Sequence, residues 1–214
     1  MSTLRTITDF KTALAGGGAR PNLFEVDIAT IPAVTEGIDW DADTFKFLCK
    51  AAALPASNVA PIDVPFRGRI LKVAGDRTFD TWTVTVINDE DFKLRSAFEL
   101  WMNGISKLDN NTGATNPSSY MANAVVHQLG RGADKGRMAA STTNSEIAGG
   151  TAIKPLRTYM FRDIFPTNIS QIDLSYDTGD TIEEYTVEFQ VQYWTAGSGQ
   201  ITGGATDQAG VSIT

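Results

Sequence analysis

The alternation of apolar and polar residues along the chain is most regular at residues 81–87. In an extended chain, one side of this segment carries only threonine and the other carries only large apolar residues. The threonines are Thr81, Thr83 and Thr85, and the apolar residues are Trp82, Val84 and Val86. Because successive side chains of a strand leave opposite faces, the pattern predicts a strand with one buried face and one wet, uncharged face.

A second segment, residues 184–193, alternates in the same way and is the clearest predicted strand near the end of the chain. Its apolar positions are Tyr185, Val187, Phe189, Val191 and Tyr193. Its polar positions are Glu184, Thr186, Glu188, Gln190 and Gln192. This strand is therefore also expected to bury one face and to expose the other.

Weaker alternation predicts further strands. Residues 22–29 and 44–51 each show apolar residues at every second position, and the second segment places Phe45, Phe47 and Cys49 on one face. Residues 66–73 are more polar and predict one arm of a hairpin. Residues 121–129 fit a strand or a short helix, and the pattern does not separate the two. Residues 159–176 predict a loop that runs into a strand at Ile172, Leu174 and Tyr176.

The chain contains one convincing helix pattern. Leu94, Ala97, Phe98 and Trp101 fall at helical spacing and form one apolar stripe, which is expected to pack on the sheet. Asn88 and Asp91 fit a capping box before the stripe, and Gly104 is expected to end the helix. A shorter amphipathic helix is predicted before Gly16–Gly18.

The predicted elements favour a mainly β fold built as a single domain over residues 1–194, with an N-terminal arm at about 1–18. Residues 195–214 are rich in Gly, Ser and Thr and are expected to form a weakly docked extension. Residues 109–120 and 130–152 are expected to be loops.

Composition narrows the classes of function. The chain of 214 residues has a net charge of −7 and lacks clustered Lys and Arg, which argues against tight general binding of nucleic acid. A single cysteine excludes an intrachain disulfide. The first residues lack a signal-peptide core and no apolar run reaches membrane-spanning length, so the protein is expected to be made and kept in a cytoplasm.

Residues with catalytic or metal-binding chemistry are few. His127 is the lone histidine, and spacing alone does not exclude a dyad with Cys49. Cys49 lies in a predicted strand, however, where a buried inert thiol is more usual. Asp39, Asp41 and Asp43 resemble the start of a calcium loop, but the Gly and Glu that complete it are absent, which favours a solvated acidic turn. No enzyme activity, cofactor or metal is predicted, although weak divalent binding at this turn stays open.

Several segments together resemble the major tail tube protein of contractile-tailed bacteriophages. The residues that carry the resemblance are "ARPNLFEVDI" (19–28), "FKFLCKAAALPAS" (45–57), "VAGDRTFDTWTVTVINDED" (73–91), the helix around Phe98 and Trp101, "FPTNI" (165–169) and "VEFQVQYW" (187–194). The resemblance does not cover residues 30–44, 106–120, 130–155 or the extension from 195.

The resemblance implies a structural protein and not an enzyme. Its subunits are expected to have a β-sandwich-like or barrel-like fold with one flanking helix, and to form hexameric rings whose strands join across subunits into one barrel. Rings stack into a hollow tube inside a contractile sheath, and DNA passes through without tight binding. The implied partners are other copies of the chain, the tail sheath protein, and the baseplate and tail terminator proteins. The protein would reside in the virion tail, assemble in the bacterial cytoplasm and not insert into a membrane. A baseplate tube initiator, or a tube protein of a related contractile injection system, is the alternative.

Two sets of surface residues become candidates on this hypothesis. Either polar strand face could line the lumen, and the candidates are Thr81, Thr83 and Thr85, or Glu184, Glu188, Gln190 and Gln192. The hairpin "IDVPFRGRILKV" (62–73) is expected to join successive rings. "GDR" (75–77) is interpreted as a turn whose charges cross a subunit boundary or pair with Asp80. The subunit and ring contact candidates are Arg67, Arg69, Asp76, Arg77 and Asp80.

Overall fold

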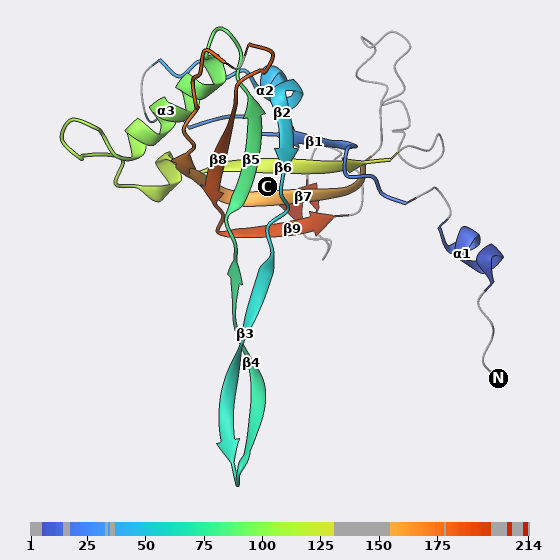
Figure 1. Cartoon of the computed structure of the whole chain (residues 1–214). Coiled ribbons are helices and arrows are strands. Elements are labelled where there is room, and N and C mark those ends of the chain that lie inside the picture. Colours follow the sequence, from blue (N-terminus) through green and yellow to red (C-terminus); the bar gives the residue numbers. More distant parts are fainter. Residues whose placement is uncertain are drawn as a thin grey trace. The chain divides into compact units, whose positions relative to one another are not determined.

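The structure, a computed structural model, describes residues 6–14, 18–32, 34, 37–130, 155–177, 179–197, 205–206 and 212–213 (Figure 1). The chain divides into two compact units. The larger unit contains Val26–Val125 and Met160–Trp194, and the smaller contains Met1–Glu25, Val126–Tyr159 and Thr195–Thr214. Residues 26–125 and 160–194 of the larger unit include the long hairpin and the two-stranded ladder described below.

The described residues form a mainly β fold, as predicted. The helices are α1 (Ile7–Ala13), α2 (Ala42–Leu48), α3 (Lys93–Ile105) and the short 3-10 helix η1 (Pro117–Ser119). The strands are β1 (Phe24–Asp27), β2 (Cys49–Ala52), β3 (Ser57–Phe66), β4 (Arg69–Phe79), β5 (Trp82–Ile87), β6 (Ala122–Leu129), β7 (Pro155–Ile169), β8 (Glu184–Gln190), β9 (Tyr193–Gly197), β10 (Ala205–Thr206) and β11 (Ser212–Ile213). None of the helices in the described ranges is long and apolar enough to cross a membrane.

The main sheet has the strand order β1-β6-β7-β8-β5-β2, with β9 also paired to β7. Strands β3 and β4 form a separate hairpin, and β10 and β11 form a separate pair. Strand β7 contains a positive φ of 53° at Asp163 and a register shift between Pro166 and Asn168. Both irregularities bend a strand and strengthen its twist, so only the last part of β7 pairs with β8.

The core of the larger unit lies on one face of β5 and β8. In this antiparallel ladder Trp82 lies opposite Phe189, and Val84 lies opposite Val187. All of these side chains are fully buried. Helix α3 covers the same face: its predicted stripe is buried, and the Phe98 ring lies 5.9 Å from the Phe189 ring. The predictions of both strands and of the packed helix are therefore confirmed.

The predicted start of α3 is wrong. The helix begins at Lys93 after Phe92, which has a positive φ of 52°, and it ends at Ile105. Asn88 does not cap it. Its backbone N–H donates to the Glu183 carbonyl at 2.9 Å, and its side-chain amide donates to the Glu183 carboxylate at 3.0 Å. Asn88 therefore fastens the end of β5 to the segment that enters β8.

The predicted strand over 44–51 is also wrong, because α2 occupies most of it. The Asp41 carboxylate accepts hydrogen bonds from the backbone N–H groups of Asp43 and Thr44, both at 3.1 Å, and so caps the helix. Phe45 is fully buried, whereas Phe47 is 86% exposed. Residues two apart share a face on a strand but point in nearly opposite directions on a helix, so the helix buries only one of the two rings.

Three other segments can be compared with their predictions. Residues 122–129 form strand β6, one of the two alternatives. The strand predicted at Ile172, Leu174 and Tyr176 is absent: β7 ends at Ile169, and these residues belong to the connection to β8. Tyr193 begins the separate strand β9 and is 45% exposed, so it does not share the buried face of β8.

The short N-terminal helix is confirmed as α1, which begins with a capping box formed by Thr6 and Asp9. The predicted loop at 130–152 lies, apart from residue 130, outside the described residues, as does most of the 195–214 extension. The prediction of one domain over 1–194 stays a prediction.

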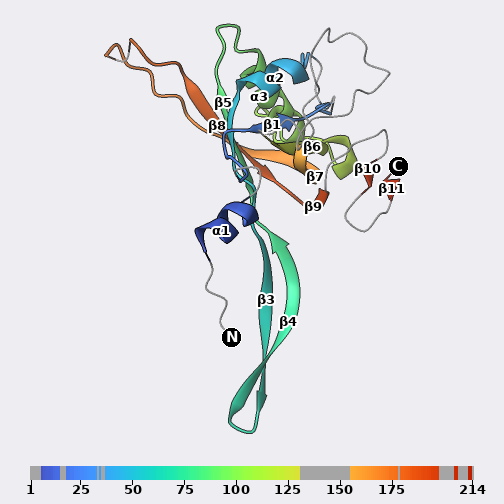
Figure 2. The same cartoon turned by 90° about the vertical axis from the view of Figure 1, so that its right-hand side faces the viewer.

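The predicted hairpin is confirmed and is longer than the pattern indicated. Strands β3 and β4 pair from Ser57 opposite Phe79 to Phe66 opposite Arg69. Arg67 and Gly68 form the two-residue turn with φ values of 45° and 81°, as a type I′ turn requires. In Figures 1 and 2 the hairpin projects well beyond the rest of the larger unit.

The interpretation of "GDR" as a turn is wrong, because Gly75, Asp76 and Arg77 lie inside β4. The glycine has a different role. A register shift in β3 between Val59 and Pro61 brings the chains together, and a Cβ atom on Gly75 would lie 2.7 Å from the Ala60 carbonyl oxygen. Glycine at position 75 therefore permits the close approach of β3 and β4.

We expect Phe45→Ala to lower the free energy of unfolding by about 3–5 kcal/mol, because it leaves a cavity between Trp40 and Phe98. The matched variant Phe47→Ala should change it by less than about 0.5 kcal/mol. Urea unfolding followed by circular dichroism measures both. Similar losses in the two variants would contradict the helical assignment of α2.

We expect Gly75→Val to separate β3 from β4 near the bulge, because the new side chain meets backbone at 2.7 Å. Ala74→Val is the matched control, since Ala74 is an exposed neighbour on the same strand. Hydrogen exchange of the hairpin amides should be faster by about tenfold or more in Gly75→Val and unchanged in the control. Equal protection in both variants would contradict the steric role of Gly75.

Candidate functional site

The threonine face of β5 and the polar face of β8 are parts of a single surface. Thr83 lies directly opposite Glu188, Thr85 lies opposite Thr186, and Ile87 lies opposite Glu184. Side chains that lie opposite one another in a ladder share a face of the sheet. The two sets of polar residues that the sequence left as alternatives are therefore neighbours.

This polar face continues onto the flanking strands. Ala51 of β2 lies opposite Thr85, and Asn168 of β7 lies opposite Glu188. The face thus crosses β2, β5, β8 and the end of β7, on the side opposite to α3. Its strand residues Thr83, Thr85, Thr186, Glu188 and Gln190 are all partly exposed. We call this surface the polar sheet face.

Not every candidate lies within the polar sheet face. Thr81 precedes β5 and Gln192 follows β8, so both lie beyond the ends of the paired strands. The backbone N–H of Gln192 donates to the Arg162 carbonyl at 3.3 Å. Thr83, Thr85, Glu184 and Glu188 are the candidates that the β5–β8 ladder brings together, and Gln190 lies opposite Phe165 of β7.

The polar sheet face is close to neutral. Lys50 of β2 forms an ion pair with Glu184, which offsets one of its carboxylates. Glu188 supplies the second carboxylate, and hydroxyl or amide groups occupy Thr83, Thr85, Thr186, Asn168 and Gln190. Lys50 and Asn168 were not predicted for this surface, since their places depend on strand pairing between distant segments, and Thr186 was predicted on the polar face of its strand but not as a lumen residue.

Strand β2 forms an edge of the main sheet. It pairs with β5 on one side, and no strand within the described ranges pairs with its other side. An unpaired edge exposes backbone N–H and C=O groups and can accept a strand from another chain.

Cys49 and His127, the two residues considered for a catalytic dyad, belong to different compact units. Cys49 is buried, as predicted, and burial raises the pKa of its thiol to about 12, so that little thiolate exists near neutral pH. His127 Nδ1 lies 3.0 Å from the Thr158 hydroxyl oxygen. Within the described part of the chain, no group of three His, Cys, Asp or Glu side chains is placed to hold a metal ion.

The β3–β4 hairpin has one apolar face without cover from the rest of the described chain. Ile62 lies opposite Val73, and Val64 lies opposite Leu71. These four side chains are 42–61% exposed. The other face contains the ion pair between Lys72 and Asp63, at 2.8 Å.

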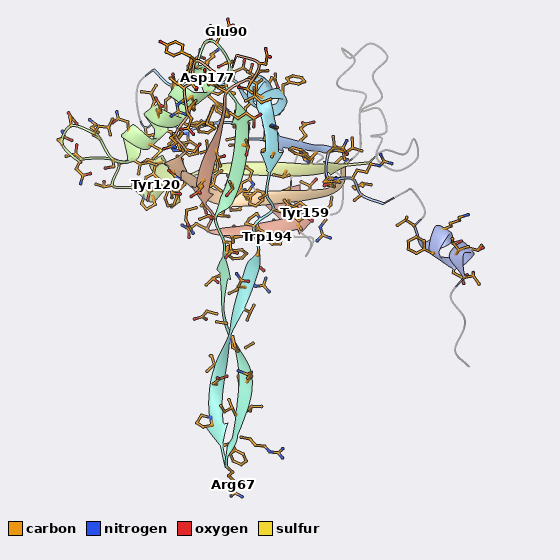
Figure 3. The ribbon with its side chains drawn as sticks, in the orientation of Figure 1. Arg67, Glu90, Tyr120, Tyr159, Asp177 and Trp194 are labelled. Carbon is orange, nitrogen blue, oxygen red and sulfur yellow. The ribbon has the colours of Figure 1, made fainter. Side chains whose placement is uncertain are left out.

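The predicted contact residues are spread along this hairpin. Arg67 lies at its tip (Figure 3) and its guanidinium lies 5.5 Å from the centre of the Phe66 ring. Arg69 begins β4, while Asp76 and Arg77 lie farther along the same strand. Asp80, just after the hairpin, accepts a hydrogen bond from the Asn58 amide at 3.0 Å. The structure thus gives Asp80 a partner other than the predicted Arg77.

The sequence of the chain is similar to those of phage tail proteins. The sequence profile of the family described as phage tail tube protein matches residues 19–197. The tail tube protein of Enterobacteria phage T4 is 34% identical over 180 residues, which cover 84% of this chain and 93% of the relative.

Two solved structures share the fold at low sequence identity. One is the 6-fold symmetrised baseplate of the anti-feeding prophage, with a TM-score of 0.51, 12% identity, and coverage of 85% of this chain and 96% of that chain. The other is the sheath/tube terminator of an extracellular contractile injection system, with a TM-score of 0.52, 12% identity, and coverage of 85% and 97%. The profile match and the phage relative show that the chain belongs to the phage tail tube protein family, whose members are structural components of the virion tail and not enzymes.

Proposed function

We propose that six copies of this chain close into a ring and that rings stack into the hollow tube of a contractile phage tail. The observation that carries the proposal is the difference between the two faces of the sheet: one face is buried beneath α3 and β7, while the residues of the polar sheet face are partly exposed. The number six is supported by the 6-fold baseplate structure that shares the fold.

In the proposed ring, the free edge of β2 pairs with the sheet of the neighbouring copy. Such pairing satisfies the exposed backbone groups and closes the sheets into one barrel. A barrel built from several strands per subunit is wide enough to enclose water. Its inner wall must then be polar, and the polar sheet face has this character.

The near-neutral charge of the polar sheet face suits passage of DNA. A wall rich in Lys and Arg would bind phosphates and release counterions at each contact, which would hold the DNA in place. Here hydroxyl and amide groups dominate, and the single lysine pairs with Glu184. We infer that the genome slides along this wall without tight binding.

The hairpin is proposed to join successive rings. A two-stranded hairpin is at best marginally stable alone in water, and this one exposes Ile62, Val64, Leu71 and Val73. Contact with a neighbouring ring would bury that apolar face.

The other proposed partners follow from the place of the tube in the tail. They are the sheath protein around the tube, the baseplate at one end and the terminator at the other, with assembly in the host cytoplasm. A solved sheath/tube terminator with the same fold supports this assignment. A baseplate tube initiator is the second candidate function, and the baseplate structure that shares the fold favours it. Long tubes from the purified chain support the tube subunit, whereas short caps support the initiator.

We expect the double variant Thr83→Lys, Thr85→Lys to form tails of normal length that deliver the genome poorly. The new ammonium groups would bind phosphates at each ring, so infective titre should fall by about tenfold or more. Complementation of a phage that lacks the gene measures titre, and electron microscopy measures tail length. Leu108→Lys, Thr115→Lys is the control of equal charge, since both residues are exposed on a loop. An unchanged titre in the first variant would remove the lumen assignment.

We expect Val64→Asp, Leu71→Asp to leave rings intact but to prevent stacking, because two carboxylates would face the next ring on the apolar face of the hairpin. Pro61→Asp, Ala74→Asp places the same charges on a facing pair of the opposite face and is the control. Electron microscopy and sedimentation distinguish rings from tubes. Long tubes from the first variant would refute a stacking role for the hairpin.

A further inference from the structure

The larger unit has two chemically different ends. The hairpin precedes Trp82, which pairs with Phe189 at one end of the β5–β8 ladder. At the other end Ile87 pairs with Glu184, and the connections 88–92 and 170–183 meet there. Figure 3 accordingly places Arg67 at one extreme of this unit and Glu90 and Asp177 at the other.

The end formed by residues 88–92 and 170–183 is acidic. These connections contain Asp89, Glu90, Asp91, Asp173, Asp177, Asp180 and Glu183, and they contain no Lys or Arg. None of the ion pairs found within the described ranges uses any of these seven carboxylates. Among the described residues this end therefore concentrates negative charge, with Lys93 following Asp91 and Arg95 donating to the Ser170 carbonyl at 3.4 Å at its border.

The same end contains a groove lined by apolar and polar residues, which we call the acidic groove. Its cavity of about 590 Å³ is lined by the apolar residues Ile172, Leu174, Tyr176 and Ile182 and by the polar residues Asp173, Ser175, Thr181, Glu183 and Glu184. Leu174 is 80% exposed and Ile182 is 72% exposed. Figure 2 shows this connection, in orange, extending away from β5 and β8. Clustered exposed apolar side chains rimmed by polar groups are typical of a binding surface.

The hairpin tip has the complementary chemistry. Residues 64–72 contain three basic residues, Arg67, Arg69 and Lys72, and no acidic residue. Lys72 pairs with Asp63, but no ion pair among the described residues uses Arg67 or Arg69. Phe66 is 66% exposed at the tip.

We propose that the hairpin tip of one copy docks into the acidic groove of a second copy in the next ring. Phe66 enters the acidic groove between Leu174 and Tyr176, while Arg67 and Arg69 pair with the carboxylates of Asp173, Asp177 and Asp180. The proposal rests on the proposed stacking of rings and names the surface that receives the hairpin.

This contact would also give the tube its direction. The tip and the groove lie on opposite ends of one unit, so their contact is head-to-tail and repeats without limit along an axis. Two acidic ends that met would repel each other, because like charges placed together disfavour an interface. Rings would therefore stack in one orientation only.

Charge reversal tests the proposal. The two samples are the double variant Arg67→Glu with Arg69→Glu and the double variant Asp177→Lys with Asp180→Lys. We expect each double variant alone to form tubes shorter by about tenfold or more, since each places like charges against each other. An equimolar mixture should again form long tubes, because each variant then offers the charge that the other lacks. Length distributions from electron microscopy measure all three samples. Recovery in the mixture also shows that both variants are folded. Lys107→Glu, on an exposed loop, is the control.

The outcomes separate this inference from the proposed function. If the mixture fails to recover while Val64→Asp, Leu71→Asp prevents stacking, the hairpin joins rings but docks elsewhere, and the groove assignment is wrong. Unaffected tubes from either charge-reversed variant alone would also overturn it. If no hairpin variant changes tube length, the stacking role itself fails.

Discussion

The β5–β8 ladder is the interaction on which the rest of the structure depends. Its register places Trp82, Val84, Val86, Tyr185, Val187 and Phe189 on one buried face, where Phe98 and Trp101 of α3 pack against Phe189, and Phe161 of β7 stacks on Trp82. Because strand side chains alternate, the same register places Thr83, Thr85, Thr186 and Glu188 on the opposite face. A shift by one residue would expose the core and bury the carboxylates, so the packing of the helix also determines the surface proposed to meet the DNA.

Three surfaces of a single copy lack a partner among the described residues, and self-assembly would supply one for each. Strand β2 has an edge that no described strand pairs, the hairpin exposes an apolar face, and Asp173 and Glu183 of the acidic groove form no ion pair within the described residues. Each would be costly or unstable in an isolated protein, and in the proposed tube each would be satisfied by a second copy of the chain. The edge would act within a ring, while the hairpin and the groove would act between rings. Gly75 contributes by allowing the twisted hairpin to form.

The sequence predicted the elements whose periodicity is local. Strands β5 and β8 and the stripe on α3 were predictable because the core selects residues at every second position or at helical spacing. Helix α2 was not predicted, since Phe45 and Phe47 alternate as they would on a strand. The Asp41 carboxylate instead caps a helix that buries only Phe45. Leu174 and Tyr176 suggested a buried strand although both are exposed. The sequence left the polar residues of β5 and of β8 as two alternative lumen faces, because the pairing of Thr83 with Glu188 joins segments about 100 residues apart.

The most direct test of the central claim is a helical reconstruction, by electron cryomicroscopy, of tubes formed by this chain, at a resolution that places side chains. The account predicts that Thr83, Thr85, Thr186, Glu188 and Gln190 face the lumen, with α3 outside them. A tube whose lumen is lined by α3, or in which the polar sheet face meets another subunit or the outer solvent, would contradict it.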